Sequence, residues 1–201
     1  RAWRRVLAQW NLAPPPDWFH PWIGVADRKL AAHLAESGTV PADAATILQA
    51  KRSVYDAMSR VDLKPFTGVR EGINTLRYRL RKLGHAPSEC LAVCTSSVRT
   101  EALTSLTTTG LIGFFPRMVC GDEVSQIKPS PEPYLKAAEL LGLVPGECIV
   151  LEDSRAGITA AMTAGCYTLA IASTHAASEL PPSHQVFDST AAAIAWLLQL
   201  E

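Results

Sequence analysis

Short apolar runs alternate with helical patterns in the part of the chain that follows residue 90. Runs of strand length lie at residues 91–94, 118–120, 149–151, 167–172 and 185–187. Apolar side chains at helical spacing lie between these runs and after them, at residues 98–106, 132–141, 156–164 and 190–200. Alternation of this kind is typical of a parallel sheet covered by helices on both faces. The pattern therefore predicts an α/β fold with a doubly wound parallel sheet, that is, a Rossmann-like core.

The first part of the chain has helical spacing alone. Apolar side chains repeat at this spacing in residues 1–11, 27–36 and 41–61, and no run there resembles a strand. The segment Lys64-Pro65-Phe66-Thr67-Gly68 has the composition of a linker, and a helix over residues 69–83 is expected after it. We therefore expect an all-helical module before the linker and the α/β part after it.

Charge and cysteine content narrow the class of protein. The 201 residues carry 19 basic and 19 acidic side chains, so the net charge is zero and nothing favours nucleic acid or an acidic membrane as the partner. No apolar run approaches the length of a membrane span. The five cysteines have no zinc-like spacing and several lie in apolar runs, so we expect reduced core residues of a cytoplasmic protein. A monomer is the plain expectation.

Two adjacent carboxylates follow the apolar run at residues 149–151. Glu152 and Asp153 would lie at the carboxyl end of a strand, where open α/β sheets bind their ligands. Two acids there attract a hard cation such as Mg²⁺, which takes oxygen ligands. The alternative is that Asp153 or Ser154 only caps the helix that follows, as at most joints between a strand and a helix. The pair alone leaves both interpretations open.

Two other strand ends carry polar side chains. Thr95, Ser96 and Ser97 follow the first run, where their hydroxyls and the N–H groups at the start of a helix suit an anion, with plain N-capping as the alternative. Lys128 precedes a proline and a predicted helix, a position typical of a surface lysine. Taken together, hydroxyls, an ammonium group and paired carboxylates at three such joints are suited to binding phosphate beside a divalent cation. The set lacks a nucleophile, because no Ser–His or Cys–His arrangement is indicated.

These segments resemble motifs of a known family. They are Thr95-Ser96-Ser97, the stretch from Gly121-Asp122-Glu123 to Lys128-Pro129-Ser130-Pro131, and Leu151-Glu152-Asp153-Ser154 with Gly157, Ala160, Ala161, Ala164 and Gly165. They resemble motifs two, three and four of the haloacid dehalogenase-like hydrolases, and the most similar subgroup is the β-phosphoglucomutase-like phosphatases. The fourth motif is the most specific, and the resemblance spans essentially the whole chain.

The resemblance implies a division into domains. Residues 1–64 would be a helical cap domain inserted after the first core strand, and residues 65–201 would be the rest of the α/β core. The segment at residues 64–69 is similar to the one that returns the chain from cap to core in that group. Arg28 lies where the cap of the family often presents a basic residue to the substrate, although a solvated helix residue is an equal alternative.

The resemblance also implies a role for each motif. Thr95 and the backbone of Ser96 would hold the transferring phosphoryl group, and Ser97 would lie within reach of a ligand. Lys128 would bridge this phosphate and the nucleophile. Glu152 and Asp153 would bind Mg²⁺.

The first motif of the family, an Asp-x-Asp after an apolar strand, does not occur in the 201 residues. Its strand would lie at the centre of the sheet, between the strands that end at Thr95 and Asp153. Without it, two ladders of buried backbone groups would lack hydrogen-bond partners, and each such group is costly. We therefore expect this strand upstream of residue 1. A structure in which the strands ending at Thr95 and Asp153 pair directly would refute the expectation.

The resemblance implies a Mg²⁺-dependent phosphatase for a small, sugar-like phosphate. An upstream aspartate would form an aspartyl-phosphate that water then hydrolyses, and a second aspartate would serve as general acid and base. A sugar-phosphate mutase on the same scaffold is the nearest alternative. The other is a non-catalytic member that binds phosphate or a protein partner, and it applies if the chain is complete as printed.

Overall fold

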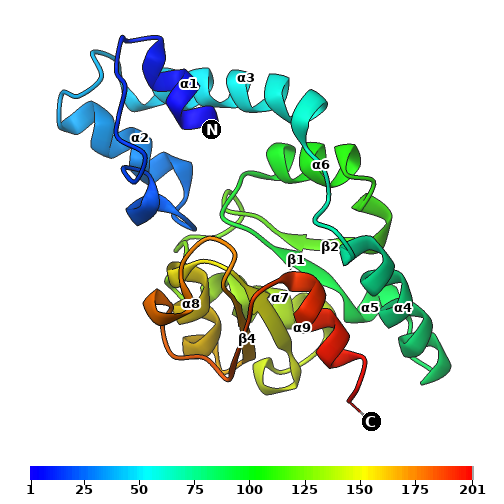
Figure 1. Cartoon of the computed structure of the whole chain (residues 1–201). Coiled ribbons are helices and arrows are strands. Elements are labelled where there is room, and N and C mark those ends of the chain that lie inside the picture. The colour runs from blue at the N-terminus through cyan, green and yellow to red at the C-terminus, as the bar shows by residue number, and fades with distance from the viewer. Residues whose placement is uncertain (201) are drawn as a thin grey trace.

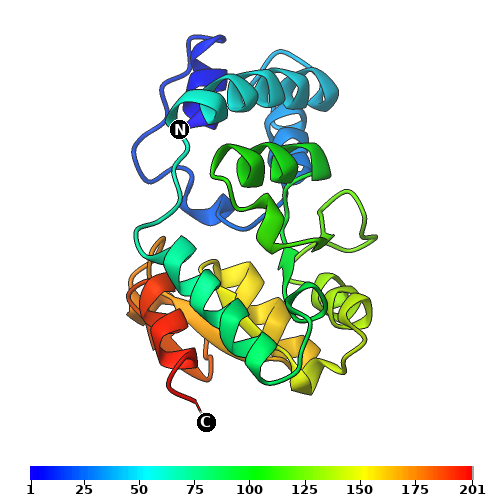
Figure 2. The same ribbon diagram turned by 90° about the vertical axis from the view of Figure 1, so that its right-hand side faces the viewer.

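The protein consists of a helical cap and an α/β core, which lie one above the other in the computed structural model (Figures 1 and 2). The structure describes residues 1–200, apart from the side chains of Asp62 and Pro87, so Glu201 of the expected core domain lies outside the described residues. Within the described part, no helix combines the length and apolar character needed to cross a membrane.

Three helices and a short turn make up the cap: α1 (Ala2–Ala8), a 3-10 turn (His20–Trp22), α2 (Asp27–Glu36) and α3 (Ala44–Asp62). They bury their own apolar cluster, in which Val6, Leu30 and Ile47 are almost inaccessible to solvent. The carboxylate of Asp43 accepts a hydrogen bond from the backbone N–H of Thr46 at 2.7 Å. This N-cap explains why α3 begins at Ala44 and not at residue 41 as the sequence predicts.

Within residues 1–200, five short parallel strands form the sheet layer, and they fall into two groups. In the first group β1 (Ala92–Cys94) pairs with β2 (Arg117–Val119). The second has the order β3 (Ile149–Glu152), β4 (Tyr167–Ile171), β5 (Gln185–Phe187). No ladder joins β1 to β3 among residues 1–200. The predicted parallel sheet is therefore present in two pieces, and the direct pairing that would refute an upstream strand is not found, so that strand stays a prediction.

Helices cover both faces of the strands. One face carries α7 (Glu132–Leu141) and α8 (Arg155–Ala164), and the other carries α4 (Val69–Lys82) and α9 (Thr190–Leu197). Val150 packs into the α7–α8 cluster, whereas its neighbour Leu151 packs with Val69 and Ile194 of the α4–α9 cluster. Because successive side chains of a strand point to opposite faces, the two clusters lie on either side of the sheet. This confirms the predicted α/β layering.

The remaining helical elements connect these layers. They are α5 (Pro87–Cys90), α6 (Arg99–Thr108) and 3-10 turns at Ile112–Phe114, Pro145–Glu147 and Ala177–Glu179. Of these, only α6 was predicted, because a single turn of helix leaves no periodic pattern in a sequence. Helix α6 lies directly below α3 and joins the core to the cap (Figure 1).

The strands differ in how much of their surface is buried. Strand β4, with a neighbour on each side, is buried from Thr168 to Ile171. All three residues of β1 are only half-buried, and Ile149 of β3 is 44% exposed. Central parallel strands are normally buried on both faces. The two strands that border the interval between the groups, β1 and β3, thus share incomplete burial with the edge strand β5, whose Val186 is 47% exposed.

Candidate active site

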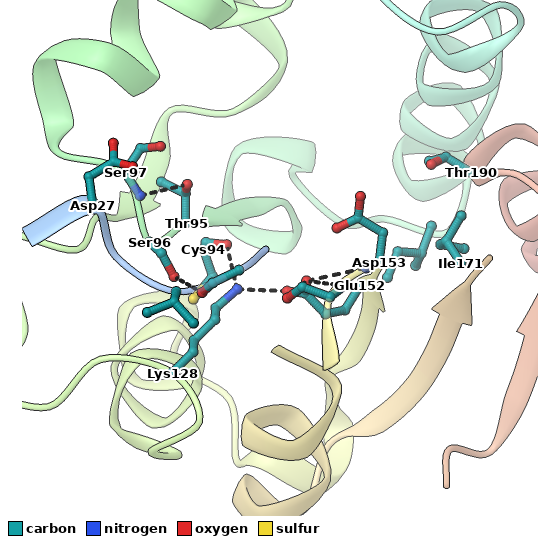
Figure 3. Close-up of a pocket in the computed structure, with 14 residues that line it drawn as sticks. Asp27, Cys94, Thr95, Ser96, Ser97, Lys128, Glu152, Asp153, Ile171 and Thr190 are labelled. Atoms are coloured by element: carbon teal, nitrogen blue, oxygen red, sulfur yellow. Dashed lines mark hydrogen bonds and ion pairs between the residues drawn. The ribbon is translucent and has the colours of Figure 1, made fainter. Parts of the chain in front are cut away.

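A cavity of about 390 Å³ lies between the cap and the carboxyl ends of β1 and β3 (Figure 3). Its wall includes every residue that the sequence singles out except Arg28, namely Thr95, Ser96, Ser97, Lys128, Glu152 and Asp153. These residues come from three joints between a strand and a helix. The structure therefore gathers them where open α/β sheets bind ligands.

Lys128 is held at the base of the cavity by three oxygen atoms. Its Nζ donates to Oε2 of Glu152 at 2.6 Å, to the hydroxyl of Tyr134 at 2.8 Å and to the carbonyl oxygen of Cys94 at 3.2 Å. The side chains of Lys128 and Tyr134 are both buried. An ammonium group has three hydrogens, and each has a partner here. Lys128 is thus a fixed positive charge between the two groups of strands.

Glu152 is the centre of a dense set of hydrogen bonds. Its Oε2 also accepts from the Tyr134 hydroxyl at 2.5 Å, and its Oε1 accepts from the backbone N–H of Ser154 at 3.0 Å and from the Ser154 hydroxyl at 2.8 Å. Burial opposes ionisation, but Lys128 and these donors outweigh it and hold the pKa of Glu152 below its usual value. Glu152 is therefore a carboxylate at neutral pH.

Asp153 has the opposite electrostatic environment. Burial raises the pKa of Asp153, and the negative charge of Glu152 raises it further. Its nearest side-chain donor is the hydroxyl of Ser173, at a long 3.4 Å. Figure 3 shows its carboxylate pointing away from Glu152 and into the cavity. A partly buried carboxylate with little compensation is a suitable ligand for a hard cation.

The two carboxylates fit a Mg²⁺ site, but only as part of one. Among residues 1–200, no cluster of three or more His, Cys, Asp or Glu side chains is placed to hold a metal. Both oxygens of Glu152 already accept hydrogen bonds, so Asp153 is the more available ligand. Mg²⁺ usually keeps several waters and binds one or two carboxylates plus phosphate oxygens. The donors present therefore suit Mg²⁺ together with a phosphate.

The loop after β1 is shaped by close backbone contacts. The N–H of Ser97 donates to the Thr95 hydroxyl oxygen at 3.1 Å, and the Ser96 hydroxyl donates to the carbonyl oxygen of Gly24 in the cap at 2.8 Å. A Cβ on Gly121 would collide with the carbonyl group of Ser96, so only glycine fits there. The hydroxyl of Thr95 acts as an acceptor in this turn, which leaves its hydrogen for a ligand.

The start of α6 bears on one expectation about this loop, which stays a prediction. The sequence predicts that N–H groups at the helix start face the anion, together with Thr95 to Ser97. The helix begins later, at Arg99, and the N–H of Arg99 donates to the carboxylate of Asp122 at 2.9 Å. The first N–H group of α6 is therefore already occupied.

The cap contributes Gly24, Val25 and Asp27 to the cavity wall. Gly24 has a left-handed φ of 79°, and a Cβ there would overlap the hydroxyl of Ser154, so the cap backbone approaches the core as closely as it can. Arg28 is exposed and does not line the cavity. The structure thus places the acidic neighbour, and not the predicted basic residue, beside the site.

Sequence reasoning missed three side chains that bear on the site. Tyr134 was interpreted only as part of an apolar helix face, although it bonds both Lys128 and Glu152. Asp27 and Lys51 form an ion pair in the cap, and Lys51 also bonds Glu101 of α6 at 2.8 Å. The only signal for Tyr134 was its place six residues after Lys128, and nothing in the sequence indicated the other two.

Comparison with known proteins points to one family. A family model described as haloacid dehalogenase-like hydrolase matches residues 2–171. The phosphorylated carbohydrates phosphatase of Thermotoga maritima is 33% identical over 167 residues, which cover 82% of this chain and 72% of that protein. Protein CbbY of Rhodobacter capsulatus is 36% identical over 143 residues, covering 68% of this chain and 60% of CbbY, so the chain spans less than two thirds of that relative.

A solved structure is similar as well. It is a Thermotoga maritima protein named provisionally as a β-phosphoglucomutase, and it is 26% identical with a TM-score of 0.68. The match covers 98% of this chain and 89% of the solved one. The sequence resemblance to this subgroup and the α/β architecture with a helical cap are therefore both supported by independent comparison.

Proposed function

The chain belongs to the haloacid dehalogenase-like hydrolases, and we propose that it is a phosphoric monoester hydrolase that acts on a small phosphorylated metabolite of the sugar-phosphate type. One observation carries the proposal: Thr95, Lys128 and Asp153 meet at one cavity although they come from three separate joints. The name of the Thermotoga maritima relative, a phosphatase of phosphorylated carbohydrates, supports the substrate class.

The proposed roles follow from the contacts. The phosphoryl group lies against the Thr95 hydroxyl and the backbone of Ser96, with Ser97 at the edge of the same loop. Lys128 offsets the negative charge of the phosphoryl oxygens, because its ammonium group is fixed at the base of the cavity. Arg28 has no part in the proposal, since its side chain is exposed outside the cavity.

Asp153 and Glu152 would hold Mg²⁺, which when bound supplies a Lewis acid beside the phosphoryl group. Asp153 is the more available of these two ligands. Glu152 orients Lys128 and keeps its own charge through Tyr134 and Ser154.

The nucleophile is proposed to lie on a strand upstream of residue 1, between β1 and β3. No ladder joins those strands within residues 1–200, and both are only partly buried, which supports this position. An aspartate oxygen would attack phosphorus as the bond to the leaving oxygen breaks, and a second aspartate would protonate that oxygen. Water would then attack the aspartyl-phosphate and release inorganic phosphate. In this scheme residues 1–64 are the cap domain and the core runs from residue 65 to residue 201.

A sugar-phosphate mutase remains the second candidate, because the matched solved structure carries that name. The full reading frame, with whatever residues precede Arg1, would be incubated with Mg²⁺ and a glucose monophosphate and followed by phosphorus NMR. We expect free phosphate to accumulate. Conversion to an isomeric glucose phosphate without free phosphate would favour the mutase, and no reaction with any sugar phosphate would favour a non-catalytic binding protein.

A further inference from the structure

The cap presents a single charged side chain to the cavity, among the residues that the structure describes, and this side chain is acidic. It belongs to Asp27, the first residue of α2. Building on the proposed function, we propose that Asp27 selects substrates with an uncharged, hydroxylated leaving group and rejects those that carry a second phosphate. Asp27 would thus be a specificity-determining residue for a sugar or polyol monophosphate.

The position of Asp27 fits contact with the leaving group. Figure 3 shows Asp27 on the same side of the cavity as Ser96 and Ser97, across from Glu152 and Asp153. If the phosphoryl group occupies the core side between Thr95 and Lys128, the remainder of the substrate extends towards the cap. The cap wall there consists of Gly24, Val25 and Asp27. Of these, only Asp27 carries a polar side chain.

The carboxylate of Asp27 is held in place by the cap itself. The indole Nε1 of Trp3 donates to its Oδ1 at 2.7 Å, and Lys51 forms an ion pair with its Oδ2. Each carboxylate oxygen has two lone pairs, so each retains acceptor capacity for a substrate hydroxyl. A fixed acceptor selects between ligands better than a mobile one, because little rotational freedom is lost on binding.

Lys51 does not supply a positive charge to the cavity. It is buried, it does not line the cavity, and it is shared between Asp27 and Glu101 of the core. Burial opposes its charge, but the two carboxylates outweigh burial and raise the pKa of Lys51. The cluster therefore holds two carboxylates and one ammonium group, and Asp27 is the only one of the three that lines the cavity.

Among the described residues, the charges at the cavity wall disfavour a second phosphate. This wall carries three carboxylates, Asp27, Glu152 and Asp153, and one cation, Lys128, which already pairs with Glu152. A divalent cation at Asp153 would offset one phosphate dianion. A second phosphate would lie near Asp27, where Lys51 is buried and does not line the cavity, and like charges brought together out of bulk water repel. A neutral group with hydroxyls would instead gain hydrogen bonds to Asp27.

The test compares a matched pair of ligands, fructose 1-phosphate and fructose 1,6-bisphosphate, on the full reading frame with Mg²⁺. Both kcat/KM for phosphate release and the dissociation constant from calorimetry are measured. We expect the monophosphate to be preferred at least tenfold in both quantities. Asp27→Asn should reduce this preference by roughly tenfold, since it removes the repelling charge but keeps the shape and an acceptor oxygen.

Two control variants separate the charge from the fold of the cap. Glu101→Gln removes a carboxylate from the same Lys51 cluster but does not lie at the cavity wall, and Arg28→Gln changes the exposed neighbour of Asp27. Both should leave the preference unchanged, with thermal unfolding confirming that all variants are folded.

The outcomes distinguish this inference from the proposed function. Equal use of the two ligands, an unchanged preference in Asp27→Asn, or the same change in Glu101→Gln would overturn the role of Asp27. Absence of turnover with either ligand would count against the hydrolase, while the ratio of the two dissociation constants would still decide whether Asp27 discriminates between them.

Discussion

The side-chain nitrogen of Lys128 lies 2.6 Å from Oε2 of Glu152, and the two side chains are only 5% and 10% exposed. The pair joins the segment before α7 to the carboxyl end of β3, across the interval that separates the two groups of strands. It therefore contributes both to the charge of the cavity and to the cohesion of the core.

Breaking this pair from one side should be strongly destabilising. Lys128→Met leaves the Glu152 carboxylate buried without its main partner, a change that typically costs about 3–5 kcal/mol. The double variant Lys128→Met, Glu152→Gln should lose less than the sum of the two single variants, because no uncompensated charge remains. Urea unfolding of the four proteins measures the coupling.

The matched control is Lys136→Met, which breaks a more exposed pair with Glu132 and should cost far less. Strict additivity in the cycle would contradict the proposed coupling.

Asp153→Asn should stabilise the protein when no divalent cation is present. Burial and Glu152 raise the pKa of Asp153, so the folded state disfavours its charge at neutral pH, and removing the charge relieves this. Single stabilising substitutions, including those that improve the distribution of charge, commonly add about 0.5–2 kcal/mol. The midpoint of urea unfolding in the presence of a chelator measures the gain. Asp188→Asn, at an exposed position, is the control and should change little. A loss of stability in Asp153→Asn would show that this charge is not strained.

The pKa of Glu152 predicts a specific acid sensitivity. Because the folded state lowers this pKa below its usual 4.5, the stability from the Glu152 carboxylate is present above that value and is lost as the pH falls through the lower, folded-state pKa. The raised pKa of Asp153 makes stability change with pH in the opposite direction. Because Glu152→Gln removes the carboxylate with the lowered pKa, this variant should lose less stability below pH 4.5 than the wild type. Unfolding midpoints measured from pH 7 downwards test this. If the unfolding midpoints of the two proteins fall in parallel with pH, Glu152 is not the source of the acid sensitivity.

Gly157 should tolerate no side chain. A Cβ at this position in the first turn of α8 would overlap the carboxyl group of Glu152. We expect Gly157→Ala to cost about 1–3 kcal/mol through overpacking and to impair the site by displacing Glu152. Gly146→Ala is the matched control, since nothing lies near its added Cβ, and it should be neutral or slightly stabilising. Equal stability of the two variants would mean that the packing over Glu152 is loose.

The pattern of the sequence was sufficient for the layers of the fold but not for its fine geometry. Helix α2 has the predicted bounds because its apolar face, with Leu30 and Leu34 buried, has a clear period. The first helix ends at Ala8, before the predicted residue 11, because Asn11 adopts a left-handed φ of 58° that no periodicity reveals.

The sequence predicted those residues of the site that lie between a strand and the helix after it. Thr95, Lys128 and Asp153 meet because the carboxyl ends of parallel strands share one edge of a sheet. The sequence did not indicate whether Asp27 or Arg28 faces the cavity. Adjacent helical residues differ by about 100° in direction, and only tertiary packing decides which one faces the core. The ion pair of Lys51 with Asp27 likewise depends on contact between two helices.

The rate of phosphate release from a sugar monophosphate by the full reading frame, with and without Mg²⁺, tests the central claim most directly. We predict that release requires Mg²⁺ and that it falls by at least a hundredfold in Asp153→Asn. Excess substrate should not restore the rate of this variant, as expected when a group acts in the transition state. Release that continues at the wild-type rate in a chelator, or in Asp153→Asn, would contradict the assignment of this cavity as a Mg²⁺-dependent phosphatase site.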